Sequence, residues 1–150
     1  MPRTDIDALP DDARIWIFGT GRTLEPEEER ELLVEVDRFL ESWKAHEDPL
    51  TCAREWREGR FLVVGVDERT APPSGCSIDA MVNVLKRLER RLDVPLTGHG
   101  PVYWRDGEGR VCRAPRGEFG RMAREGEVDL DTPVFDPTLT RMSELRAGRL

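Results

Sequence analysis

The chain has 150 residues, of which 30 are acidic and 23 are basic, and its formal net charge is −7. A chain of this length is the usual size of one domain and buries roughly 70% of its unfolded surface, so it needs no disulfide or metal for stability. No stretch approaches the ~18 apolar residues of a membrane helix and no apolar signal segment is present, so we expect a cytoplasmic protein without a membrane partner; its negative charge argues against a nucleic-acid partner.

The first part of the chain predicts an arm, a strand and a helix. Residues 1–13 are polar and form an extended arm, and residues 15–18 form the first strand. Pro26 and the three glutamates after it suit the positive end of a helix dipole. A helix from Pro26 is then predicted by apolar residues at helical spacing, namely Leu32, Leu33, Val36, Phe39, Leu40 and Trp43.

The middle of the chain predicts two strands and a second helix. Residues 51–57 form a short strand, and residues 60–67 form a buried strand after a tight turn at Glu58-Gly59. A loop with two prolines leads to a helix over 77–92, whose last turns carry the basic residues expected at the negative end of a helix dipole.

The last third of the chain predicts shorter elements. Residues 101–105 and 110–113 form a second hairpin, and residues 118–124 form a helical turn. Residues 133–135 are extended, and a last helix begins with Asp136 as its cap and Pro137 at its first position.

The order of the predicted elements defines the expected fold. Strand, helix, strand, strand, helix and strand follow one another in the ferredoxin-like (split βαβ) arrangement. We therefore predict an α+β fold with an antiparallel sheet and both helices on one face, followed by an extension with a hairpin strand and short helices. The chain forms a single domain over 1–150, with the arm at 1–13, the α+β core at 14–113 and the C-terminal extension at 114–150.

The residues that most often bind metals or cofactors are few. Three widely spaced cysteines, an odd number, predict free thiols in a reducing compartment. Two separated histidines form no zinc motif, and Gly19-x-Gly21 lacks the third glycine of a dinucleotide site. We expect no metal and no cofactor.

The sharpest local pattern is Ser74-Gly75-Cys76-Ser77-Ile78-Asp79, at the start of the second predicted helix. A Cys76 thiolate at this position would be stabilised by unsatisfied helix amides and by the helix dipole, which increases reactivity. The alternative is a polar helix cap in which Cys76 packs as a small apolar residue.

Three other residues complete a candidate catalytic set. His46, in the connector after the first helix, is a candidate base for Cys76, although it could equally cap the end of that helix. Asp79 and Asp67 are candidate orienting carboxylates, and both are also consistent with solvated or capping roles. His99, in a glycine-flanked loop, is a weaker candidate.

Several segments together resemble a family of small bacterial proteins to which no activity is assigned. The matching segments are Arg14-Ile15-Trp16-Ile17, Trp43-x-x-His46, Phe61-Leu62-x-Val64-x-Val66-Asp67-Glu68, Ser74-Gly75-Cys76-Ser77-Ile78-Asp79 and Gly126-x-Val128-x-x-x-Thr132-x-Val134-Phe135. Some members are labelled ABC transporter ATPases, but this chain has no phosphate-binding loop. Where relatives tend to have an arginine after the second helix, this chain has Thr97-Gly98-His99-Gly100. The last matching segment also resembles a short element of small peptide-binding modules.

Two functional hypotheses follow. The favoured one is a non-catalytic binding or assembly module that contacts a protein partner or a second copy of itself through the sheet or the C-terminal segment. The alternative is a thiol-dependent enzyme or thiol sensor in which Cys76 is the nucleophile, His46 the base, and Asp79 or Asp67 the orienting carboxylate.

Overall fold

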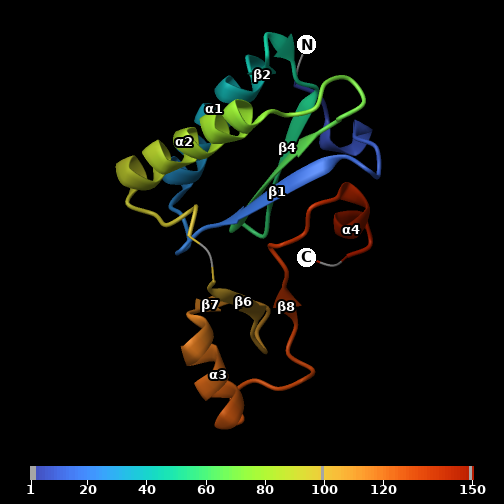
Figure 1. Cartoon of the computed structure of the whole chain (residues 1–150). Helices are drawn as coiled ribbons and strands as arrows, with labels where there is room; N and C mark the ends of the chain where they lie inside the picture. Colours follow the sequence, from blue (N-terminus) through green and yellow to red (C-terminus); the bar gives the residue numbers. More distant parts are fainter. Residues whose placement is uncertain (1–2, 99, 149) are drawn as a thin grey trace.

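The computed structural model describes residues 3–98, 100–148 and 150 and confirms a mixed α+β protein with small antiparallel sheets. Two long helices, α1 (Pro26–Glu41) and α2 (Gly75–Leu92), lie side by side on one face of the main sheet (Figure 1). A second, smaller sheet and α3 (Arg116–Arg124) lie below that sheet in the same view. No helix in the described part of the chain combines the length and apolar character needed to span a membrane.

The main sheet has three antiparallel strands in the order β1-β5-β4. They are β1 (Arg14–Gly19), β4 (Cys52–Arg57) and β5 (Phe61–Val66). All six residues of β5 are buried because the sheet is covered on both faces. One face packs on α1 and α2, and the other packs on the 3-10 helix η1 (Ile6–Ala8) and on α4 (Met142–Arg146).

Local capping explains where the long helices begin. The Glu25 and Glu28 side chains exchange hydrogen bonds with the backbone at the start of α1, where Pro26 occupies the first position. Ser74 and Ser77 form the equivalent capping box on α2. Both helices therefore begin close to where the sequence predicts them, and Leu32, Leu40 and Leu85 point into the core between helices and sheet.

The connector that holds His46 is a short hairpin. β2 (Lys44–Ala45) pairs with β3 (Asp48–Pro49), and His46 and Glu47 form the turn with φ of 51° and 70°. The predicted extended arm also differs from the structure, since it contains η1 and is held to β4 by a hydrogen bond from the Thr4 N–H to the Cys52 carbonyl (2.7 Å).

The fourth strand of the ferredoxin-like prediction is not in the main sheet. β6 (Val102–Arg105) pairs with β7 (Val111–Ala114) and with β8 (Val134–Phe135), so the predicted hairpin forms but belongs to a separate three-stranded sheet. The order β1-β5-β4 matches three of the four strands of that fold. The ferredoxin-like topology as a whole is not established by the structure.

The last predicted helix begins later than expected. Asp136 does accept a hydrogen bond from the Thr138 N–H (3.0 Å), but the chain then runs extended beside β1 and α4 starts only at Met142. The Asp136 side chain therefore caps a turn in place of a helix. The chain after this turn pairs with β1 before α4 begins.

Candidate functional site

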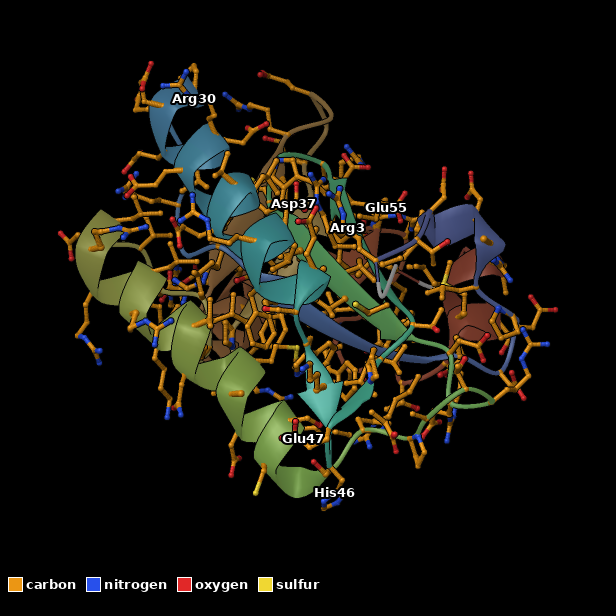
Figure 2. All side chains as sticks on the ribbon, turned by 90° about the horizontal axis from the view of Figure 1, so that it is seen from above. Arg3, Arg30, Asp37, His46, Glu47 and Glu55 are labelled. Carbon is orange, nitrogen blue, oxygen red and sulfur yellow. The ribbon has the colours of Figure 1, made fainter. Side chains whose placement is uncertain are left out.

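Cys76 lies at the second position of α2 with its side chain exposed. The Trp43 indole N–H donates to the Ser77 carbonyl (2.8 Å) and fixes the segment that leads into the β2–β3 hairpin against the start of α2. Figure 2 shows His46 at the tip of that hairpin, beside the N-terminal end of α2. The structure therefore places Cys76 and His46 at the same end of the molecule.

The four predicted catalytic residues nevertheless do not form a connected set. Among the described residues, no hydrogen bond or ion pair joins the Cys76 thiol to His46, and the Asp79 side chain is exposed without a polar contact. The role proposed for these residues therefore remains a prediction. His99 lies outside the described residues.

Asp67 has a different partner from the one predicted. Its carboxylate accepts hydrogen bonds from Arg69 at the guanidinium (2.9 and 3.0 Å) and at the backbone N–H (3.0 Å). Side-chain hydrogen bonding from Arg69 lowers the pKa of Asp67, although burial opposes this effect. Asp67 thus remains ionised at neutral pH in a local ion pair. The described residues contain no cluster of three or more side chains suited to a metal ion.

The glycines at the end of β1 and just after it allow close packing. A Cβ atom at Gly19 would lie 2.5 Å from the Tyr103 hydroxyl, and one at Gly21 would lie 2.6 Å from the Pro95 ring. The absence of a side chain at Gly19 lets Tyr103 of the second sheet approach β1. These contacts give both glycines a structural explanation that needs no phosphate ligand.

The free edge of β1 is the feature that the sequence did not identify. The Thr20 N–H donates to the Arg60 carbonyl, just before β5 (2.8 Å). Alternate residues of an antiparallel strand direct their N–H and C=O groups to the same side, so residues 14, 16 and 18 also direct theirs toward β5. Ile15, Ile17 and Gly19 then direct theirs to the opposite side. Among the described residues, only the Ile15 N–H of these three outward N–H groups has a backbone partner, the Thr140 carbonyl (2.9 Å).

The C-terminal segment covers only the beginning of this edge. The Met142 N–H donates to the Ala13 carbonyl (2.9 Å), and Arg141 pairs with Arg14 in an antiparallel bridge. Before Thr140 the segment leads instead to β8, which pairs with β6. The edge of β1 from Ile17 to its end is consequently left facing a cleft.

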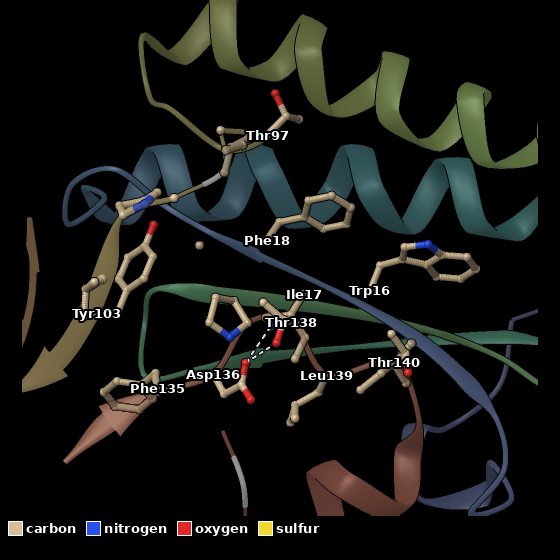
Figure 3. A pocket seen from close by; sticks show the side chains of 18 of the residues that line it. Trp16, Ile17, Phe18, Thr97, Tyr103, Phe135, Asp136, Thr138, Leu139 and Thr140 are labelled. Carbon is tan, nitrogen blue, oxygen red and sulfur yellow. Dashed lines mark hydrogen bonds between the residues drawn. The ribbon is translucent and has the colours of Figure 1, made fainter. Parts of the chain in front are cut away.

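That cleft has a volume of about 740 Å³, within the range of ligand sites, roughly 300–1,000 Å³. Its walls are β1, residues 96–98 and 100–103, and the segment 134–140. Figure 3 shows Trp16 and Phe18 directed toward the helices, with Ile17 on the opposite side of the strand and with Tyr103 and Phe135 at one end. An extended segment in the cleft would thus meet apolar side chains on both sides of its backbone.

Two walls of the cleft are held by specific contacts. The Tyr103 hydroxyl donates to the Thr20 carbonyl (3.3 Å), and the Phe61 ring packs on Tyr103 and Phe135 at centroid distances of 5.0 and 4.9 Å. Glu89 of α2 accepts hydrogen bonds from the Leu96 and Thr97 N–H groups. The walls of the cleft are therefore anchored to the main sheet and to α2.

Comparison with family models, curated proteins and solved structures gives no match to this chain. The cleft and the open strand edge therefore carry the functional argument. The run Ile15-Trp16-Ile17-Phe18 predicts the strand itself, but its position at the edge depends on where β6 pairs, about 85 residues further along the chain.

Proposed function

We propose that this protein is a non-catalytic cytoplasmic binding module that takes an extended segment of a partner protein along the edge of β1. The observation that carries the proposal is the outward backbone of Ile17 and Gly19, which faces the cleft between β1 and the C-terminal segment. A strand edge with available N–H and C=O groups binds extended peptides by adding a strand to the sheet.

The strand order supports this proposal. In the ferredoxin-like fold a fourth strand lies next to the first and antiparallel to it, whereas here β6 belongs to the second sheet. A partner strand antiparallel to β1 would complete the four-stranded ferredoxin-like order. We therefore propose that the sequence encodes most of this fold and that the partner supplies its last strand.

Side-chain exposure also supports it. Trp16, Ile17 and Phe18 are only half-buried although both faces of the sheet are covered. Side chains on the two faces of a bound strand would bury the remaining surface of Trp16 and Phe18 on one face and of Ile17 on the other. Backbone pairing would then provide affinity, and the side-chain contacts would provide specificity.

The proposal is tested by selecting binders from a random-peptide phage library with the whole protein as bait. Each selected peptide is then resynthesised with one N-methylated amide at a time. We expect N-methylation to abolish binding at every second position, because only alternate peptide N–H groups face β1. Bound peptide should also slow hydrogen exchange at the Ile17 and Gly19 amides.

An internal control distinguishes binding at β1 from non-specific peptide binding. Arg54, on the outer strand β4, also directs its N–H away from β5, so its amide exchange serves as the internal control. Protection at Ile17 and Gly19 but not at Arg54 supports the proposal. Selected peptides without two-residue periodicity, peptides that protect Arg54 instead, or a selection that yields no peptide would overturn it.

A further inference from the structure

The charges around the cleft differ from those of the chain as a whole. The chain has seven more acidic than basic residues, yet the residues lining the cleft include two arginines, Arg14 and Arg116, and one carboxylate, Asp136. Asp136 is engaged in hydrogen bonds with Thr138. The cleft is therefore locally basic on an acidic protein.

Neither arginine of the cleft is neutralised by a carboxylate in the described part of the chain. The Arg14 guanidinium lies over the Trp16 ring at 4.8 Å, and Arg116 Nε donates to the Gly100 carbonyl (3.1 Å). Elsewhere many arginines do form ion pairs, such as Arg91 with Glu31 (2.6 Å). The two guanidinium groups thus remain available to a ligand in the cleft.

Two more arginines add positive charge behind Tyr103. Arg60 is 7% exposed and donates only to neutral oxygens, those of Thr20 (3.1 Å from Nε to Oγ1 and 3.1 Å from Nη2 to O) and the Val111 carbonyl (3.0 Å). The Arg113 guanidinium lies 6.0 Å from the Tyr103 ring centroid. A charge that is buried without a counterion acts over a longer range than a screened surface charge.

We propose that the occupant of the cleft is an acidic peptide segment in which Asp or Glu alternates with apolar residues. This inference rests on the proposed function and adds the chemical class of the partner. Because the side chains of a paired strand alternate between the two faces of the sheet, the carboxylates would lie on the face of β1 that carries Arg14 and Trp16, and would reach Arg14 at one end and Arg116 at the other. The apolar residues would contact Ile17 on the opposite face. A nucleic acid fits less well, since its backbone has no row of N–H groups to pair with β1 and the chain has a net charge of −7.

Three labelled hexapeptides test the inference in fluorescence anisotropy titrations. In each, Val alternates with Glu, Gln or Lys. We expect the Glu peptide to bind about tenfold more tightly than the Lys peptide, with the Gln peptide between them. Raising KCl to about 0.5 M should remove most of this difference, because salt screens exposed charges.

Arg116→Glu is the informative variant, and Arg124→Glu is its matched control. Both arginines are exposed on α3, and only Arg116 lines the cleft. Arg116→Glu should abolish or reverse the preference for the Glu peptide, whereas Arg124→Glu should leave it unchanged. An unchanged preference in Arg116→Glu, or a Glu peptide that binds no better than the Lys peptide, would overturn the inference. Binders from the random library would still stand in that case, so the two proposals fail separately.

Two further measurements distinguish other occupants. A labelled dT12 oligonucleotide should not bind, and binding that is lost in Arg116→Glu would overturn the inference in favour of nucleic acid. The mass of the protein alone in sedimentation equilibrium should stay that of a monomer. A mass that rises with concentration, except in Arg116→Glu, would assign the cleft to a second copy of the chain.

Discussion

The two outer strands of the main sheet, β1 and β4, carry different kinds of side chains at their free edges. β4 carries charged side chains at three of its six positions, and its Arg54 is bound to Asp37 by hydrogen bonds of 2.7 and 2.9 Å. Figure 2 shows Arg3, Asp37 and Glu55 close to this strand. β1 carries one charged residue, Arg14, followed by the apolar run 15–18.

This difference shows which edge is protected. Charged residues on an edge strand prevent it from pairing with another chain, since pairing would desolvate them. Arg3 adds an ion pair with Asp37 (3.4 Å) and reinforces the protection of β4. In the described part of the chain the edge of β1 has no comparable charged residue beyond Arg14, and from Ile17 onward it faces the cleft. One sheet thus combines an edge that resists pairing with an edge suited to it.

Proline substitutions in β1 should have the largest effects on peptide binding and stability. Ile17→Pro removes an outward N–H and should leave the protein folded, because proline is tolerated where an edge strand faces away from its neighbour. It should reduce the affinity for library-selected peptides by more than about tenfold, since a lost backbone hydrogen bond and a clash both oppose pairing. Phe18→Pro removes an inward N–H and should destabilise the fold by about 1–3 kcal/mol relative to Phe18→Ala.

Urea unfolding and peptide titrations check this pair of variants. The expected result is that Ile17→Pro loses binding and Phe18→Pro loses stability. Equal destabilisation by both prolines would contradict the strand register on which the argument rests. Unimpaired peptide binding by a folded Ile17→Pro would contradict strand addition at β1.

Replacing Arg54 tests whether its charge keeps the edge of β4 from pairing with another chain. In Arg54→Val the strand loses its ion pair with Asp37, in which both side chains are about one-fifth exposed. The cost in stability should be about 1 kcal/mol. The larger consequence should be concentration-dependent light scattering, because β4 then loses one of the three charged side chains that protect its edge. Arg38→Val, which removes an exposed ion pair with Glu35 on α1, is the control and should scatter no more than wild type.

Much of the fold can be predicted from local sequence, but the edges of the sheet cannot. The apolar spacing of residues 32–43 predicts α1, and the polar segment 74–79 predicts the start of α2 to within two residues. The β2–β3 hairpin is not predictable in the same way, because His46 and Glu47 adopt positive φ in place of the usual Asn-Gly.

The candidate cleft depends on contacts that are remote in sequence. It exists because β6 pairs with β7 and β8, and because residues 140–142 pair with the start of β1. No local pattern around residues 15–18 contains that information. The cysteine motif, by contrast, is visible in sequence, yet among the described residues no base is hydrogen-bonded to the exposed Cys76 thiol.

Glu89 offers a smaller test, directed at the wall of the β1 cleft. Burial alone would raise the pKa of Glu89, but hydrogen bonds from Leu96 and Thr97 outweigh it and lower the pKa below the usual 4.5. The lowered pKa means that the carboxylate contributes stability above pH ~4.5, and this contribution is lost as the pH falls through the folded pKa. Glu89→Gln should therefore cost about 0.5–1 kcal/mol at pH 7 and much less at pH 3.

Urea denaturation of both proteins at the two pH values measures this difference. Arg90→Gln, an exposed change on the adjacent residue, is the control and should show no such pH dependence. A Glu89→Gln penalty of the same size at both pH values would mean that the hydrogen bonds do not depend on the charged form. The segment 96–97 would then be held mainly by the buried Leu96.

The cysteines provide the smallest expected effect and test the alternative function. Burial raises the pKa of the Cys52 thiol to about 12, and burial with the nearby Asp106 raises that of Cys112, whereas Cys76 is exposed. Iodoacetamide with peptide mapping should therefore label Cys76 first and Cys52 only on unfolding. If the protein is a binding module, Cys76→Ser and His46→Ala should each change peptide affinity and stability by less than about 0.5 kcal/mol. Labelling of Cys76 much faster than that of a free thiol, and slowed by His46→Ala, would show that the ring activates the thiol and would favour the thiol-dependent reading over strand addition at β1.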